Sequence, residues 1–250
     1  MSCDCHNFKE RLLSLQVVQQ MIKIAYKEKK PLSLSRFSHA ELLYLSWPEG
    51  TTLTTYFDKY RKYNGGTDQI DEIKEGVLEA LNKVDITGIL TTGDWDSTNW
   101  DKMTNDVFHK LDFTPEHVCS AWITQQMVRD PKKKFMKWLK NKDIILVGRR
   151  SKEAAKKLKK LEINVVDCVG MESYAEIEEV QQKLVKNKKW KIALLSAGIQ
   201  ATILAPRLAA ETGKIAIDFG HAMDIFLDGT DFDHEDLVDK WNTMNNLEQT

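Results

Sequence analysis

Short polar segments follow several apolar, strand-like runs of this sequence and carry side chains suited to chemistry. Arginine side chains pair with phosphate oxygens, and backbone N–H groups at a helix N-terminus favour an anion. In an open parallel sheet, ligands bind at the carboxyl ends of the strands. The segments therefore predict a site that can hold a diphosphate. They are Arg36 to Glu41, Gly93 to Asp96, Gly148 to Arg150, Gly170 to Glu172, Ser196 to Gly198 and Asp218 to His221.

Two of these segments have alternative interpretations. Ser196, Ala197 and Gly198 lead into a helix that we expect from position 199, and small residues there suit either a phosphate contact or a plain turn. Arg149 and Arg150 follow a strand-like run and would contact a phosphate or an acceptor, or else form surface ion pairs.

Several familiar motifs are missing from the sequence. No G-x-G-x-x-G follows a strand, which argues against a dinucleotide cofactor, and there is no P-loop of the form G-x-x-x-x-G-K-[ST]. The absence of a G-x-S-x-G elbow disfavours an α/β-hydrolase. A methyltransferase using S-adenosylmethionine would want a Gly-rich loop after an early strand, and Gly148-Arg149-Arg150 is a poor substitute.

Strand-like and helical patterns alternate along the chain, most regularly in its second half. Such alternation predicts βαβ units. We therefore expect an α/β fold with a Rossmann-like parallel sheet and helices on both faces, in a single domain with a helical N-terminal part. The expected strands are 32–37, 86–92, 144–147, 163–166, 192–195 and 215–217; the expected helices are 8–26, 70–81, 151–161, 173–187, 199–212 and one beginning at Thr114-Pro115-Glu116.

Composition excludes several classes of protein. The chain has 250 residues, with 36 Lys and Arg against 37 Asp and Glu, and this near-neutral charge argues against nucleic acid as a partner. No apolar run approaches the roughly 18 residues that span a bilayer, and no secretory signal is visible. Four cysteines are too few for a disulfide scaffold, so we expect a cytoplasmic protein in which Cys119 and Cys168 are unreactive core thiols.

Charge is distributed unevenly within the single domain that we expect over residues 1–250. Residues 131–160 hold thirteen Lys and Arg and two acids. This favours a solvated helix face, or else contact with an anionic acceptor, a membrane surface at its periphery, or RNA. Within the domain we expect an N-terminal helix, a first half, a regular βαβ half and an acidic tail. Their expected ranges are 1–30, 31–142, 143–225 and 226–250.

Three segments resemble motifs of the GT-D fold glycosyltransferases. LSLSRFSHAELL at 32–43 resembles that family's strand followed by R-F-G-D-G-E, and IAIDFGHAMD at 215–224 resembles its D-[IF]-G-H segment. SAGIQATILAPRLA at 196–209 resembles its small-residue loop and helix. The resemblance covers roughly residues 10–225 in the right order. It implies a Rossmann-like domain that transfers a sugar from a nucleotide-sugar donor, such as a UDP-sugar, with a D-x-E pair and a divalent metal, in bacterial glycan or glycoprotein synthesis.

The sequence departs from the family pattern at the D-x-E pair. His39 stands where the family has Asp, while Glu41 matches the Glu. Mn²⁺ accepts a nitrogen ligand and Mg²⁺ prefers oxygen, so Glu41 and His39 would form a weaker metal site. Otherwise His39 or Arg36 neutralises the diphosphate without a metal, or the site is inactive and the protein is a nucleotide-sugar or glycan binding module with the same fold.

The resemblance also implies roles for the other candidates. Glu41, His39, His221 and Asp218 would form the catalytic group, with Asp218 and His221 orienting the donor sugar or the acceptor hydroxyl. Substrate contacts would come from Arg36, Ser38, Asp94, Trp95, Arg149, Ser196, Ala197 and Gly198.

A separate motif occurs in the segment that ends the expected strand at 86–92. Asp94-Trp95-Asp96 matches the D-x-D metal motif of the unrelated GT-A glycosyltransferase fold. Extended carboxylates at alternate positions point to opposite sides, so this segment must turn before it can chelate a metal. A solvated loop is the other interpretation, and Trp95 would either stack on a sugar or base or be buried.

Overall fold

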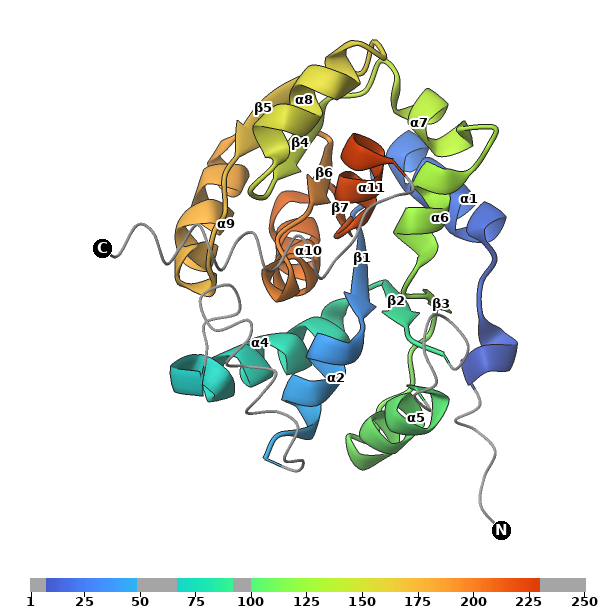
Figure 1. Cartoon of the computed structure of the whole chain (residues 1–250), viewed down its shortest axis with the longest axis vertical. Helices are drawn as coiled ribbons and strands as arrows, with labels where there is room; N and C mark the ends of the chain where they lie inside the picture. The colour runs from blue at the N-terminus through green and yellow to red at the C-terminus, as the bar shows by residue number, and fades with distance from the viewer. Residues whose placement is uncertain (1–7, 49–66, 92–99, 230–250) are drawn as a thin grey trace.

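The described part of this computed structural model, residues 8–48, 67–91 and 100–229, is built around one parallel sheet (Figure 1). The seven strands lie in the order β3-β2-β1-β7-β6-β4-β5, and every neighbouring pair is parallel. The predicted α/β fold is therefore confirmed. The strands are β1 (Leu32–Phe37), β2 (Ile86–Ile89), β3 (Val118–Ser120), β4 (Ile144–Val147), β5 (Val165–Val169), β6 (Ile192–Leu195) and β7 (Ile215–Asp218).

Helices cover both faces of the sheet. Because side chains alternate along a strand, Ile145 and Val147 of β4 belong to one apolar cluster, and Ile144 and Leu146 belong to the other. The first cluster contains residues of α2 (His39–Ser46), α4 (Ile70–Lys83), α5 (Trp100–Lys110), α9 (Ile177–Lys186) and α10 (Ile199–Thr212). The second contains residues of α1 (Leu15–Glu28), α6 (Ile123–Arg129), α7 (Lys134–Leu139), α8 (Ser151–Lys159) and α11 (Ala222–Asp228).

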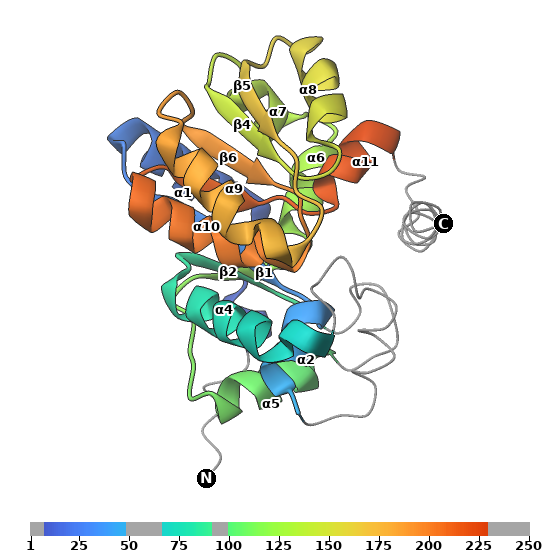
Figure 2. The ribbon, with the colours of Figure 1, turned by 90° about the vertical axis from the view of Figure 1, so that its left-hand side faces the viewer.

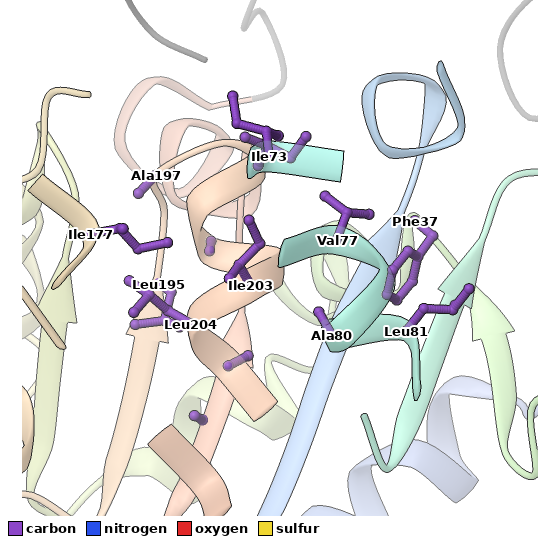
Figure 3. Close-up of a cluster of buried hydrophobic side chains, with 14 of the residues drawn as sticks. Phe37, Ile73, Val77, Ala80, Leu81, Ile177, Leu195, Ala197, Ile203 and Leu204 are labelled. Atoms are coloured by element: carbon purple, nitrogen blue, oxygen red, sulfur yellow. The ribbon is translucent and has the colours of Figure 1, made fainter. Parts of the chain in front are cut away.

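The contact between α4 and α10 lies at the centre of the first cluster. Figure 3 shows Ile203 of α10 close to Val77 of α4. A Cβ added to Gly76 would lie 3.0 Å from the Ile203 Cδ1 atom, so the absence of a side chain at Gly76 allows the two helices to approach. Both Ile203 and Val77 are fully buried.

Two predicted helices differ from the structure. Residues Phe8–Arg11 form a short 3₁₀ helix, and α1 begins only at Leu15, because the Ser14 side chain accepts a hydrogen bond from the Val17 N–H and caps the helix there. The helix expected from Thr114 is wrong. That segment leads into the edge strand β3, whose residues pair with β2.

Of the two described cysteines, Cys119 agrees with the expectation of a core thiol, whereas Cys168 is only partly buried. Cys119 is buried, and burial raises its pKa to about 12. Burial also raises the pKa of Cys168, so neither thiol readily forms the reactive thiolate. A separate observation concerns membranes: among the described residues, no helix has the length and apolar character that crossing a bilayer requires.

We expect Ile203→Ala to lower the free energy of unfolding by about 2–5 kcal/mol, because it opens a cavity between α4 and α10. Urea denaturation followed by circular dichroism would measure the change. Leu161→Ala is the control, because Leu161 is exposed and should cost about 0.5 kcal/mol or less. Equal losses in the two variants would contradict this account of the core.

Candidate functional site

A buried ion pair joins the carboxyl ends of β1 and β7. Arg36 of β1 donates from its backbone N–H to Asp218 Oδ2 at 3.1 Å and from Nη2 to Asp218 Oδ1 at 2.9 Å. The side chain of Asp218 is completely buried, and that of Arg36 is 11% exposed. Arg36 is therefore held by Asp218 through both its backbone and its guanidinium, and presents only a small surface at the strand end.

Thr202 of α10 extends this pair to α2. Its Oγ1 lies 3.2 Å from Asp218 Oδ2, 3.2 Å from Glu41 Oε1 and 3.3 Å from the Arg36 carbonyl oxygen. One hydroxyl hydrogen cannot serve three acceptors. Burial raises the pKa of Asp218, although the Arg36 guanidinium opposes the rise.

Glu41 is committed to local structure. Its Oε2 accepts hydrogen bonds from the Ser38 N–H at 2.9 Å and the Ser38 hydroxyl at 2.8 Å, which fixes the start of α2. Its Oε1 is bonded to Thr202, and the residue is buried. His39 is half-buried in the first turn of the same helix.

The donor atoms around Glu41 and His39 do not fit a metal site as they stand. Glu41 Oε2 already accepts two hydrogen bonds from Ser38, and Glu41 Oε1 lies 3.2 Å from the Thr202 hydroxyl. Within residues 8–48, 67–91 and 100–229, no group of three or more His, Cys, Asp and Glu side chains is arranged to hold a metal ion. The divalent metal therefore stays a prediction.

Close backbone contacts join the ends of β7, β6 and β4. Gly220 has φ +48°, and a Cβ there would lie 1.7 Å from Arg36 Nη2, so only glycine fits. The Ser196 hydroxyl donates to the Gly220 carbonyl oxygen at 2.7 Å. A Cβ on Gly148, after β4, would lie 2.0 Å from the Ser196 carbonyl oxygen. These loops therefore meet at one part of the sheet edge.

The N-terminus of α10 opens at this edge. Gly198 is its N-cap residue, and no side chain caps the helix. The first N–H groups of a helix have no partner within the helix, and they favour a negative charge. The side chain of Ala197 is buried in the first apolar cluster (Figure 3), so this residue can offer a ligand only its backbone.

His221 forms a second polar group beside these loops. Its Nδ1 lies 3.0 Å from Asp224 Oδ2, with 35% of the histidine side chain and 8% of the aspartate side chain exposed. Asp224 Oδ1 accepts from Arg150 Nη1 at 3.1 Å, and Arg150 also pairs with Asp228 and Glu153. The arrangement orients a partly exposed imidazole through a buried carboxylate.

The structure brings only some of the predicted site residues together. Arg36, Ser38, Glu41 and Asp218 share one hydrogen-bonded network through Thr202, and Ser196 bonds separately to the Gly220 carbonyl oxygen, in the loop that carries His221. Arg149 pairs with Glu172, after β5. Asp94 and Trp95 lie outside the described residues.

Two residues of the site were not selected from the sequence. Thr202 lies one turn beyond Gly198, a spacing that places it on the face of α10 toward β1. Asp224 follows His221 by three residues, which in a helix start puts the two side chains on one face. These two spacings are the sequence signals from which Thr202 and Asp224 could have been selected.

We expect Gly220→Ala to destabilise the protein more than Gly213→Ala. Both glycines have positive φ, but a Cβ at position 213 meets nothing within 4 Å. Gly213→Ala should therefore cost about 1–2 kcal/mol from backbone strain alone. Gly220→Ala also displaces the Arg36 guanidinium, and breaking a buried pair costs about 3–5 kcal/mol. Denaturant unfolding of both variants tests the difference, and equal losses would contradict it.

Comparisons with known proteins agree with this architecture. A family model, the GT-D fold-like domain, matches residues 13–226. A search of curated proteins gave no match. Three similar solved structures are domain of unknown function 1792 (DUF1792) proteins, and each has 85% of its own chain covered.

The three likenesses extend over nearly the whole of this chain. A selenomethionine-substituted domain has a TM-score of 0.56 with 16% identity over 97% of this chain. A domain described as having a distinct glycosyltransferase fold has a TM-score of 0.58 with 15% identity over 96%. A protein described as a new glycosyltransferase from Streptococcus sanguinis has a TM-score of 0.58 with 16% identity over 94%. At these identities the likeness shows the fold, and because the family model matches most of the sequence, the chain belongs to the GT-D fold-like domain family.

Proposed function

We propose that this protein is a glycosyltransferase that moves a sugar from a nucleotide-sugar donor to a hydroxyl group of a glycan or glycoprotein. The observation that carries the proposal is the oriented pair of His221 and Asp224 next to the loops at the uncapped start of α10. Membership of the GT-D fold-like family and the likeness to proteins described as glycosyltransferases support it.

His221 is the proposed general base. In sugar transfer the bond between the anomeric carbon and the diphosphate oxygen breaks, and a bond from the acceptor oxygen to that carbon forms. The acceptor hydroxyl loses its proton, and the Nε2 atom of His221 would take it. Asp224 would accept the Nδ1–H of His221 at 3.0 Å, which fixes the tautomer that leaves Nε2 able to accept.

The start of α10 is the proposed site for the leaving diphosphate. Negative charge grows on that group as the glycosyl bond breaks, and N–H groups aimed at it lower the energy of the transition state. Gly198 permits close approach because it has no side chain, and Ser196 lies in the adjoining loop. The small exposed part of Arg36 would add a cation at the same edge.

A non-catalytic nucleotide-sugar or glycan binding module is the second candidate, because His39 replaces the family's Asp and Glu41 is held by Ser38 and Thr202. His39→Asp separates the two candidates. In a binding module that has lost its metal site, the added carboxylate would introduce metal or donor binding. In an enzyme that uses His39, the same change would lower activity.

We expect one nucleotide sugar, a UDP-sugar in the first instance, to raise the melting temperature. A ligand at about 100 times its Kd adds roughly 2.7 kcal/mol, or on the order of 5–10 °C for a domain of this size. Each donor is tested with Mn²⁺, Mg²⁺ or EDTA. Loss of the shift in EDTA supports a metal-assisted site, and its persistence supports a metal-free one. No shift with any donor would contradict the proposed donor site.

Once the donor has been identified, the His221→Gln variant can be assayed. It should lower kcat by about 10²-fold or more, with little change in KM, because the general base is lost. His109→Gln, at an exposed histidine near the end of α5, is the control and should change neither constant. Product formation is measured by chromatography. Full activity in His221→Gln would remove this residue from the proposed mechanism.

Asp224→Asn should also lower kcat, by roughly tenfold or more, and should shift the pH profile, because the carboxylate orients the imidazole. Asp228→Asn is the matched control. It removes a carboxylate that also binds Arg150 but is not bonded to Nδ1 of His221. A similar loss in both variants, with no shift of the pH profile, would show that Asp224 acts only by holding Arg150.

A further inference from the structure

The amino edge of the sheet, opposite the candidate site, gathers lysines from three adjacent strands. Lys30 comes just before β1, Lys214 directly precedes β7, and Lys191 directly precedes β6. β7 lies between β1 and β6, and the three strands are parallel, so these lysines share one edge. In Figure 2 the strands run toward the right-hand side of the view, and the ends of α1 and α10 lie together at the left.

A pocket of about 280 Å³ opens at this edge, and we call it the lysine pocket. Lys29, Lys30, Lys191 and Lys214 line it, together with the ring of Tyr26 on one wall. None of the described residues that line it is acidic. The pocket is thus concave, and all the charged residues that line it are positive.

Neighbouring carboxylates do little to offset that charge. Lys30 pairs with Glu28 at 2.8 Å. No carboxylate among the described residues pairs with Lys29, Lys191 or Lys214. Burial, together with the nearby charges of Lys191 and Lys188, lowers the pKa of Lys214 to about 8. Lys214 instead lies 4.1 Å from the centroid of the Trp190 ring and donates to the Asn187 carbonyl oxygen.

Helix dipoles account for only part of this arrangement. α1 and α10 both end at the pocket, and the negative end of a helix favours Lys29, Lys30 and Lys214. Lys191 follows neither helix and precedes a strand, and strands have only a small net dipole.

The basic stretch at 131–160 reaches the same place. Lys142 lies 5.1 Å from the centroid of the Tyr26 ring and 4.8 Å from that of Trp138 in α7. Tyr26 therefore has Lys142 on its ring and also forms part of the pocket wall. The lysine pocket is thus continuous with the lysine-rich surface near α7.

The geometry points to the lysine pocket as a second binding site, specific for a phosphate-bearing anion and separate from the donor site at the carboxyl edge. A phosphate group carries several acceptor oxygens, and the ammonium groups of lysines that line one pocket can bind it together. The volume accommodates a phosphate or diphosphate with a few further atoms. The same chemistry is offered by a free phosphate compound and by a phospholipid headgroup. This inference does not depend on the proposed transferase activity.

Isothermal titration with pyrophosphate, at constant ionic strength, tests the site on the whole chain. We expect binding to the wild-type protein, with a loss of about tenfold in affinity for each lysine removed. Lys29→Gln/Lys191→Gln is the first variant, because both lysines are exposed and the fold should be kept. Lys214→Gln is then added. Lys110→Gln/Lys152→Gln removes the same charge from exposed positions on α5 and α8, and should leave affinity within about twofold.

A second measurement separates the two sources of phosphate. Phosphatidylcholine vesicles with phosphatidic acid are compared with pure phosphatidylcholine vesicles in co-sedimentation. Binding that needs phosphatidic acid and is lost in Lys29→Gln/Lys191→Gln, but not in Lys110→Gln/Lys152→Gln, supports the pocket and identifies a lipid headgroup. Pyrophosphate binding with the same dependence, but no vesicle binding, supports the pocket and identifies a free phosphate compound.

Two results would overturn the inference. One is the absence of both pyrophosphate and vesicle binding to the wild-type protein. The other is binding that Lys29→Gln/Lys191→Gln leaves unchanged or that Lys110→Gln/Lys152→Gln weakens equally. Binding would then depend on the total positive charge of the protein and not on the lysines of the pocket. Displacement of pyrophosphate by UDP, with no effect of the pocket variants, would assign it to the carboxyl edge. Neither result depends on whether the protein transfers a sugar.

Discussion

The buried ion pair of Arg36 and Asp218 constrains the arrangement of the site around it. Removing two charges from water is costly, and the cost is offset only when hydrogen bonds satisfy both groups. Asp218 receives the Arg36 backbone N–H and guanidinium, while Thr202 joins it to Glu41. The guanidinium in turn leaves no room for a side chain at position 220. Strands β1 and β7, the start of α2 and the first turns of α10 are thereby held together.

The same constraint separates the residues that support the site from those available to a substrate. Asp218 and Glu41 are buried and bonded, so their carboxylates shape the strand ends. His221 is partly exposed and is oriented by Asp224. The acidic members of the family-like motifs therefore lie mainly beneath the surface, and the histidine of the last motif lies where a ligand can approach it.

Sequence patterns predicted the central strands well. They predicted the edge strand β3 and the contacts between distant side chains less well. Runs such as Ile144 to Val147 are apolar throughout because β4 is buried on both faces, and that signal needs no tertiary information. β3 was missed because three residues after Thr114-Pro115-Glu116 carry too little pattern. The rule on carboxyl ends located the loops of the site. It could not show that Glu41 would bond to Thr202, 161 residues away, because that pairing depends on how α10 packs against β1.

The position of β7 beside β1 has a consequence for the order of assembly. During synthesis from the N-terminus, Arg36 emerges 182 residues before its partner Asp218. Until then, β1 can pair with β2 but has a bare edge on its other side, and the guanidinium has no carboxylate from β7. The pairing of β1 with β7 at the centre of the sheet is therefore a contact of long sequence separation, which slows folding. Meanwhile the unpaired strand edge stays exposed. Until β7 is made, the backbone N–H and C=O groups on that side of β1 are open to pairing with another chain.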